Sequence, residues 1–206
     1  MRWTLALLVQ FVVIQLYISG TLASTQPQEF FVSPFVIEEL QGKQAVIETV
    51  SGTIVVDLLA AAAPNHVGHF ILKAREGAYD GTVFHRIISM GIIQGGDPIS
   101  KNPHQQADYG TGGLGVLQFE PNSESHTRGA VSAVLVLDDR NSAGSQFFIC
   151  VTDQIALNGQ YTVFGRVVEG IATVQKLSTS PTDSNGAPVE RLEIHRVTIR
   201  DDSLSR

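Results

Sequence analysis

The residues best suited to chemistry lie in one short stretch, Phe84 to Asp97, with the letters FHRIISMGIIQGGD. It places one fixed cation, Arg86, and one neutral amide, Gln94, among apolar residues that end on two glycines. Arginine is always charged and presents its donors in a rigid planar fork, so an apolar setting aims it at an uncharged polar group. The stretch therefore predicts a site for a carbonyl or an amide.

A structural role for Arg86 is the competing interpretation. Most partly buried arginines are simply paired with a carboxylate. Asp97 and Glu120 are the candidate partners in this chain. On the arginine alone, a buried salt bridge is the favoured interpretation.

A hydrolytic triad is a weaker alternative, although Ser145, His85 and Asp97 are all present. Ser145 lies in the letters AGSQ, which do not form the strained turn that exposes a nucleophilic serine. No spacing ties this serine to a histidine. We expect Ser145 to have no catalytic role.

Metal and cofactor sites are not indicated either. His66 and His69 are three residues apart, but zinc sites need three or four ligands, so we expect both at the surface. The remaining histidines are scattered without ligand spacing: His85, His104, His126 and His195. Gly110 to Gly115 matches G-x-G-x-x-G by letter, yet no strand precedes it and no helix pattern follows it. We predict a glycine-rich loop, with neither metal nor cofactor.

The elements that must position Arg86 and Gln94 begin at about Gln44. Two β-branched runs, 44–49 and 53–58, flank a short turn and predict a hairpin. A helix is predicted from Pro64 to a stop at Gly77, with one apolar face. That face consists of Val67, Phe70, Ile71 and Ala74.

The second half of the chain predicts further strands and one short helix. Strands are expected at 130–137, at 146–151 and at 161–164, the last after the turn pair Asn158-Gly159. Ile171, Val174 and Leu177 indicate the helix. The final strand changes its alternation at Arg196, as a bulge would. The pattern favours a mainly β fold: a closed antiparallel barrel capped by two helices.

Composition limits the function classes. With 206 residues and 43% hydrophobic content, the chain predicts one domain. A formal charge of −6 and the absence of a Lys/Arg cluster argue against binding to nucleic acid or to an anionic membrane. We expect a monomer.

The N-terminus predicts export. Met1-Arg2, an apolar run from Trp3 to Ile18 and small residues up to Ala23 have the order of a signal peptide. An uncleaved anchor is the alternative, but the run is shorter than a membrane span and contains two glutamines. We expect a signal at 1–23, an irregular extension at 24–43 and a domain at 44–202, in a periplasmic or secreted protein. Cys150, the single cysteine, is expected in the core.

Five motifs in this order and spacing resemble the cyclophilin family of peptidyl-prolyl cis-trans isomerases. Their letters are FHRII at 84–88, QGGD at 94–97, GTGG at 110–113, GSQFFI at 144–149 and VFG at 163–165. The similarity runs from about Gln44 to Asp201, and residues 161–170 look most like bacterial members. The resemblance implies an eight-stranded barrel with two helices and a proline groove on its outer face, requiring no cofactor.

The resemblance also implies the site residues. Arg86 and Gln94 match the catalytic positions. The expected substrate-binding positions are His85, Gly91, Ile92, Gly110, Gln146, Phe148, Leu157 and Tyr161. With these motifs around it, Arg86 is predicted to be catalytic rather than paired.

Three departures from the family pattern stand out. Gly91 falls where a phenylalanine usually forms the pocket floor, and Ala156 stands where cyclosporin-sensitive members have tryptophan. The segment before Asn141 is longer than usual and contains Val134 to Leu137. We therefore expect weak cyclosporin binding. The favoured hypothesis is an isomerase acting on X-Pro bonds of exported polypeptides, and the alternative is a proline-peptide-binding module with little turnover.

Overall fold

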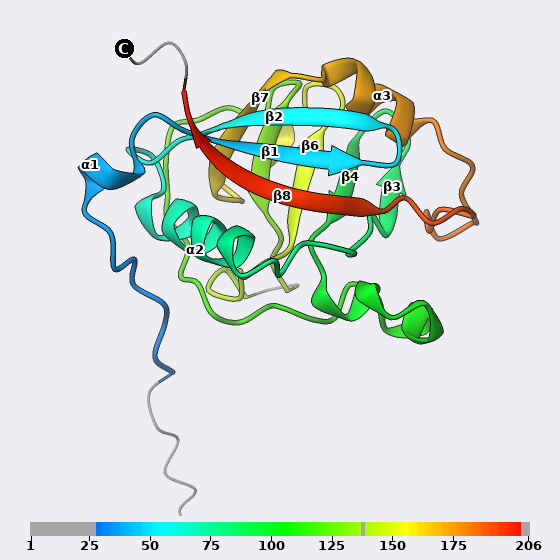
Figure 1. The fold of residues 1–206 in the computed structure, drawn as a ribbon, viewed down its shortest axis with the longest axis horizontal. Coiled ribbons are helices and arrows are strands. Elements are labelled where there is room, and N and C mark those ends of the chain that lie inside the picture. Colours follow the sequence, from blue (N-terminus) through cyan, green and yellow to red (C-terminus); the bar gives the residue numbers. More distant parts are fainter. Residues whose placement is uncertain (1–27, 137–138, 203–206) are drawn as a thin grey trace, which may run out of the picture.

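The computed structural model describes residues 28–136 and 139–202. The α-helices in these ranges are α1 (Ile37–Leu40), α2 (Pro64–Arg75) and α3 (Ile171–Ser178), and the short 3-10 helices are η1 (Pro98–Lys101), η2 (Pro103–Asp108) and η3 (Ile155–Leu157). The strands are β1 (Lys43–Thr49), β2 (Gly52–Leu58), β3 (Arg86–Ile88), β4 (Ile92–Gly95), β5 (Ala130–Ala133), β6 (Phe147–Cys150), β7 (Val163–Glu169) and β8 (Ile194–Asp201). Figure 1 shows their arrangement.

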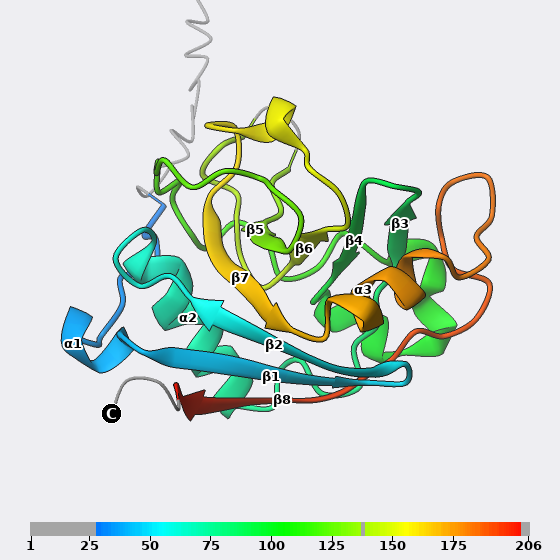
Figure 2. The ribbon, with the colours of Figure 1, turned by 90° about the horizontal axis from the view of Figure 1, so that it is seen from above.

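All eight strands form one antiparallel sheet in the order β3-β4-β6-β5-β7-β2-β1-β8, which curls into a half-barrel (Figure 2). The mainly β prediction is confirmed. The predicted closure is not supported, because β3 and β8 end the sheet and do not pair with each other in a ladder; an isolated bridge, Val83 to Glu193, joins the segments beside them.

The predicted hairpin and bulge are both present. β1 and β2 pair from Gln44–Asp57 to Thr49–Gly52, so their turn is tight. β8 pairs Arg196 with Glu48 but Ile194 with Thr49, and this register shift lies where the alternation changes in the sequence. The bulge lets the apolar side chains of β8 keep facing the core on both sides of it.

Helix α2 follows the predicted bounds. It begins at Pro64, and Gly77 ends it in the left-handed region with φ 66°. Its predicted apolar face is buried, and α2 contacts β8 and β7. The expectation of surface positions for His66 and His69 is wrong, since they are only 2% and 5% exposed.

These histidines are buried because neighbouring segments cover them. His66 Nδ1 lies 2.5 Å from a Glu120 oxygen, and the His69 ring contacts the edge of Phe31 at 5.1 Å between centroids.

Helix α3 forms as predicted, with Val174 and Leu177 buried.

The N-terminal extension is more ordered than expected. The structure has α1 before the predicted start at Gln44, and its Leu40 is 1% exposed. Phe31 and Phe35 pack against the core, although residues 28–34 have no helix or strand, as predicted. The expected signal peptide at 1–23 lies outside the described residues. The apolar side chains of the extension explain its docking, because they remove hydrophobic surface from water.

The strand predicted at 130–137 is shorter than expected. β5 ends at Ala133, and Val136 is 47% exposed. The Val136 N–H donates to Ser142 Oγ at 2.7 Å, so the chain turns locally instead of extending the ladder. Strand β7 likewise begins at Val163 rather than Tyr161.

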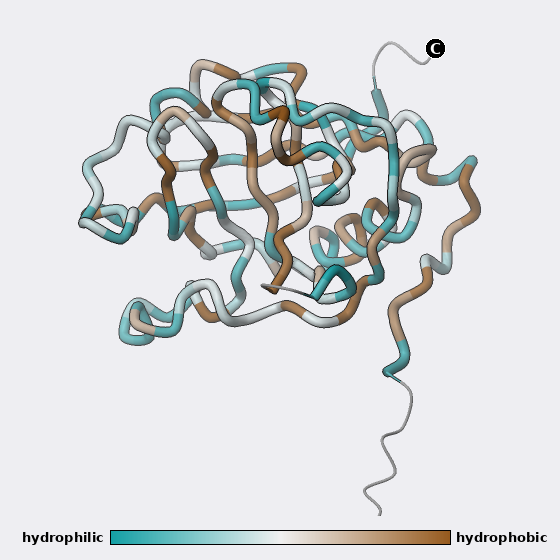
Figure 3. Tube along the Cα trace, turned by 180° about the vertical axis from the view of Figure 1, so that it is seen from behind, coloured by the Kyte–Doolittle hydropathy of each residue, from teal (hydrophilic) through white to brown (hydrophobic). Residues whose placement is uncertain are grey.

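In Figure 3, apolar residues are concentrated along the strands at the centre of the molecule, whereas the projecting loop that carries η2 is mostly hydrophilic. Among the described residues, no helix has the length and hydropathy needed to cross a membrane.

Candidate active site

Arg86 and Gln94 face each other across β3 and β4. Their Cα atoms are register partners, and Arg86 Nη1 donates to Gln94 Oε1 at 3.4 Å. Arg86 is exposed and has no carboxylate partner among the described residues. Asp97 and Glu120 accept hydrogen bonds from other groups, so the structural salt bridge does not form. Most of the five N–H donors of Arg86 remain available.

A relay of amides fixes the orientation of Gln94. Gln146 Nε2 donates to the carbonyls of Gly110 and Gly112 at 2.9 and 2.7 Å, so its Oε1 must face Gln94. Gln94 Nε2 donates to that oxygen at 3.0 Å. A primary amide has two N–H donors. The second N–H of Gln94 is therefore available to a carbonyl beside Arg86.

The glycine-rich loop is held against this relay by Asp97. This carboxylate is 0% exposed and accepts hydrogen bonds from the N–H groups of Ile99 and Gly110. A Cβ at Gly112 would lie 2.4 Å from Asp97 Oδ1, so only glycine permits the approach. Residues 110–115 form a loop, as predicted, and no helix follows Gly115.

An apolar cluster flanks the relay. Phe148, which is 3% exposed, and Ile92, which is 9% exposed, are among its buried members, and Leu157 and Tyr161 pack against the cluster. The Tyr161 ring meets Phe148 edge-on, with 5.4 Å between centroids and a 90° angle. The structure thus brings together four of the predicted substrate-binding residues.

Gly91 contributes no side chain to this cluster. It is buried, and an added Cβ would lie 3.0 Å from Ile88 Cγ2. Met90 before it adopts φ 56° and is 70% exposed, and its carbonyl accepts a hydrogen bond from Thr152 Oγ1. The floor of the site is therefore made by Ile92 and Phe148.

His85 lies beside a different cavity, on the far side of Arg86. Its ring is buried, and neither nitrogen has a hydrogen-bond partner among the described residues. Burial lowers the pKa of His85, the charge of Arg86 lowers it as well, and the nearby Asp97 carboxylate opposes this. The net shift is downward, so the imidazole is neutral at neutral pH.

Two residues of the apolar cluster were not predicted. His126 stacks on Phe148 with 6.0 Å between centroids and an angle of 16°, and Val134 packs against the same cluster. Burial lowers the pKa of His126, which the hydrogen bond with Asn158 only partly offsets. No local spacing marks His126 in the sequence, because it reaches the site through the fold alone.

The hydrolase and metal alternatives find no support in the geometry. Ser145 Oγ donates to the Gly96 carbonyl at 2.9 Å and contacts no histidine among the described residues. In the same part of the chain, no group of three His, Cys, Asp or Glu side chains could hold a metal ion. Cys150 is buried as predicted, and burial raises its pKa to about 12. The site offers fixed neutral and cationic donors beside an apolar surface.

Comparisons with known proteins identify the family that the chain matches. The family model for cyclophilin type peptidyl-prolyl cis-trans isomerases matches residues 44–199. The peptidyl-prolyl cis-trans isomerase ppi1 of Schizosaccharomyces pombe is 35% identical over 148 residues, which cover 72% of this chain and 93% of the relative. A probable peptidyl-prolyl cis-trans isomerase of Brucella suis is 37% identical over 163 residues, covering 77% and 83%.

The fold has a solved counterpart. A cyclophilin type peptidyl-prolyl cis-trans isomerase from Cryptosporidium parvum, solved in the presence of the dipeptide Ala-Pro, aligns with a TM-score of 0.69 and 28% identity. The alignment covers 77% of this chain and 99% of the other.

Proposed function

The chain belongs to the cyclophilin family and is a peptidyl-prolyl cis-trans isomerase; from this premise, we propose that Arg86 accelerates rotation of X-Pro bonds by weakening amide resonance. The observation that carries the proposal is the exposed guanidinium of Arg86, which has no carboxylate partner among the described residues and lies beside an oriented Gln94. A cation without an ion pair is free to donate to the substrate.

The chemistry follows from the amide bond. Rotation is slow because the proline nitrogen shares its lone pair with the carbonyl, which gives a barrier of about 18–20 kcal/mol. A donor to that nitrogen favours the localised lone pair of the twisted bond. Arg86 supplies such a donor, while the second N–H of Gln94 holds the carbonyl of the residue before proline. No covalent step or proton transfer is required.

The energy required is modest. Each tenfold acceleration needs about 1.4 kcal/mol of additional transition-state binding, so ten-thousandfold catalysis needs about 5.5 kcal/mol. Hydrogen bonds to charged groups contribute about 1.5–3 kcal/mol each. Arg86, Gln94 and the apolar contacts with the proline ring together supply a stabilisation of this size.

The proline ring belongs on the apolar cluster. Leu157 and Tyr161 are its half-buried members, and Phe148 lies directly beneath Tyr161. The structural relative solved with Ala-Pro supports a proline-containing polypeptide as the substrate class. Cyclosporin is expected to bind weakly, because Ala156 offers no indole at the rim, and a submicromolar dissociation constant would contradict this.

The proposed setting is outside the cytoplasm, in a bacterial exported protein that acts as a monomer. Support comes from the signal-like residues 1–23 and from the similarity of 161–170 to bacterial members. Exported chains fold without ATP, and uncatalysed proline isomerisation takes tens of seconds, so an isomerase suits this compartment. Mass spectrometry of the exported protein tests the processing, since cleavage after Ala23 predicts Ser24 as the first residue.

An exchange assay on a blocked Ala-Ala-Pro-Ala peptide tests the mechanism. We expect wild type to broaden the cis and trans NMR signals of the peptide, and Arg86→Ala to lower kcat/KM by about a hundredfold or more. Arg196→Ala, which removes another exposed arginine, is the matched control and should retain wild-type turnover. Equal activity of Arg86→Ala and wild type would contradict arginine assistance.

A binding module with little turnover is the second candidate. Gly91 leaves one side of the floor without a side chain, and Phe148 is only 3% exposed, so the grip on proline differs from that predicted by the resemblance. Peptide binding without exchange broadening would favour this candidate.

A further inference from the structure

A second cavity lies beside Arg86, on the side opposite Tyr161. It has a volume of about 480 Å³ and lies between residues 83–86, the loop that carries η2, and the loop 185–192. These two loops lie at the same end of the molecule as β3 (Figure 1). His85 and Gly110, two of the predicted substrate-binding residues, line this cavity, whereas the apolar cluster around Phe148 and Tyr161 does not.

The walls of the cavity are tied to the strand that carries Arg86. The Phe84 N–H donates to the Leu192 carbonyl at 2.9 Å, and the Ile87 N–H donates to the Gly186 carbonyl at 2.8 Å. The loop 186–192 therefore joins the edge of β3 at both ends and arches over the residues between. Its position relative to Arg86 is fixed by backbone hydrogen bonds.

Arg191 fixes the other wall. Its guanidinium donates to the carbonyls of Gly81 at 2.6 Å and Ser100 at 3.0 Å, and its Nε pairs with Glu193. One side chain thus joins the loop 185–192 to η1, and η1 leads directly into η2. Because these groups satisfy Arg191, it is not a free cation for an anionic ligand.

The remaining lining favours an apolar occupant. Apolar surface comes from both loops and the strand edge, through Phe84, Pro103, Tyr109, Pro188, Val189 and Leu192. Val189 is 71% exposed, a large apolar side chain left in water at the mouth of a hollow. Covering it with an apolar group would remove hydrophobic surface from water.

Continuity with the active site identifies the occupant. Arg86 and Gln94 border this cavity, and Arg86 also borders a cavity of about 690 Å³ on the Tyr161 side. A polypeptide whose X-Pro bond lies at Arg86 therefore has a hollow on either side. An extended chain advances about 3.3 Å per residue, so a residue two or three positions from proline reaches a neighbouring cavity of this size.

On the basis of the proposed function, we infer that the cavity bounded by Tyr109, Pro188 and Val189 is a subsite for an apolar side chain of the polypeptide substrate, two or three residues from the X-Pro pair. This subsite would make the enzyme prefer proline bonds flanked by an apolar residue. It is built from loops outside the sheet, so it adds selectivity without altering the catalytic relay.

The test compares peptides that differ at one residue. Blocked Ala-Pro peptides are extended on either side with glycine and serine and carry leucine or serine three residues before or after proline. For wild type, we expect leucine to raise kcat/KM by about fivefold to tenfold over serine in one of the two series. Val189→Asp should bring this ratio to about one, whereas Gln106→Leu, which adds apolar surface to the lining, should raise it.

Val32→Asp is the matched control, because Val32 is 76% exposed in the N-terminal segment and should keep the wild-type ratio. A ratio near one in both wild-type series, or a ratio that Val189→Asp leaves unchanged, would overturn the subsite. If the short peptide is turned over in that case, the proposed function stands without the subsite. If wild type turns over no X-Pro peptide, the proposed function fails and the subsite fails with it.

Discussion

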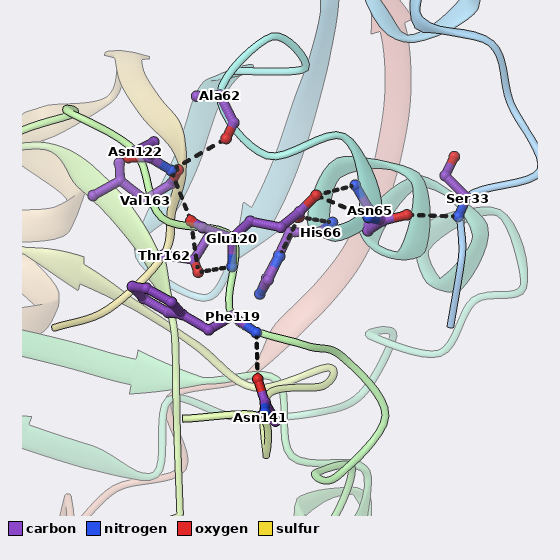
Figure 4. Close-up of polar contacts among 10 residues, drawn as sticks. All are labelled: Ser33, Ala62, Asn65, His66, Phe119, Glu120, Asn122, Asn141, Thr162 and Val163. Carbon is purple, nitrogen blue, oxygen red and sulfur yellow. Dashed lines mark hydrogen bonds and ion pairs between the residues drawn. The ribbon is translucent and has the colours of Figure 1, made fainter. Parts of the chain in front are cut away.

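Two polar networks of the molecule are built in opposite ways. One is the relay of Arg86, Gln94 and Gln146, which ends on glycine carbonyls. The other centres on Glu120, whose carboxylate accepts hydrogen bonds from the start of α2 and whose backbone N–H donates to Thr162 Oγ1 just before β7 (Figure 4). The relay consists of neutral amides and one exposed cation, whereas the Glu120 network surrounds a partly buried anion.

The Glu120 network is fully engaged. Its carboxylate accepts hydrogen bonds from the N–H groups of Asn65 and His66, from Asn65 Nδ2 and from His66 Nδ1, at 2.5 to 3.0 Å. Burial tends to raise the pKa of Glu120, but the His66 side chain and the backbone donors outweigh it, so the pKa is below its ordinary value. A helix N-terminus also favours an anion.

In the relay, only Gln146, at the inner end, uses all of its side-chain hydrogen-bonding groups. Gln146 uses both N–H donors and its oxygen, but the Arg86 to Gln94 contact is 3.4 Å, longer than an ordinary hydrogen bond, and Arg86 is exposed. A weak contact at the outer end can be exchanged for a substrate contact at little cost. The difference predicts that the Glu120 network contributes stability and the relay contributes turnover.

Removing Glu120 should produce the largest loss of stability. Glu120→Ala leaves the donors at the start of α2 unpaired in a buried site, so we expect the free energy of unfolding to fall by about 4 kcal/mol. Urea denaturation measures this loss. Glu124→Ala is the control, since its half-exposed pair with Arg166 should contribute less than about 1 kcal/mol.

Activity separates the two networks. With concentrations corrected for the folded fraction, Glu120→Ala should retain kcat/KM within about twofold, because the relay does not contact Glu120 among the described residues. A loss of turnover in the folded molecule would show that the networks are not independent.

Lowering the pH should reduce the folding stability that the residues around α2 contribute. The pKa of His69 is lowered from 6.5 to about 4, mainly by burial and also by the charges of Lys73 and His66, while Glu76 opposes the shift. The unfolded chain therefore binds a proton first, so the stability from neutral His69 is present above pH 6.5 and is lost as the pH falls towards 4. The loss corresponds to about 3 kcal/mol.

The variant His69→Phe removes this titration while keeping an aromatic ring beside Phe31. Its free energy of unfolding should fall less steeply than that of wild type between pH 6.5 and 4 in urea denaturation. Glu120 adds to the same trend, because its lowered pKa means that its contribution is lost only as the pH falls through that pKa. Parallel profiles for His69→Phe and wild type would exclude His69 as the cause.

Replacing the neutral amide of Gln94 with a carboxylate should give Arg86 an ion-pair partner and lower turnover. Gln94→Glu pairs with Arg86 and removes the N–H that faces the substrate carbonyl. We expect kcat/KM to fall about thirtyfold, or about 2 kcal/mol. Gln175→Glu, an exposed glutamine on α3, is the control. Unchanged turnover would refute the requirement for a neutral neighbour.

The sequence predicted the relay better than the Glu120 network. Arg86 and Gln94 lie close together in the chain, so their register across β3 and β4 follows from a local hairpin. His66 and His69 were misplaced because their burial depends on Glu120 and Phe31, which come from distant segments. A helical period identifies the apolar face of a helix but not the segments that cover it.

The same reason explains the errors in the strands. The run after Ala133 has strand-like side chains, yet Ser142 captures the Val136 N–H and turns the chain. The sequence also could not show whether the sheet closes. Closure would require β3 to pair with β8, and these strands lie at opposite ends of the sheet order.

Asn141 offers the finest test of independence, because it links the segment before it to the Glu120 side. Its Oδ1 accepts a hydrogen bond from the Phe119 N–H at 3.1 Å (Figure 4), and the neighbouring Arg140 lies over the Phe119 ring at 3.9 Å. Asn141→Ala removes one exposed hydrogen bond, so we expect a stability loss of about 1 kcal/mol or less. Arg140 also borders the cavity on the Tyr161 side, so kcat/KM should fall by about twofold to threefold if this wall positions substrate. The control Asn185→Ala, on the opposite loop, should leave the rate for the short peptide closer to wild type than Asn141→Ala does. If neither rate changes, this wall does not position the short substrate, and the Glu120 side contributes stability alone.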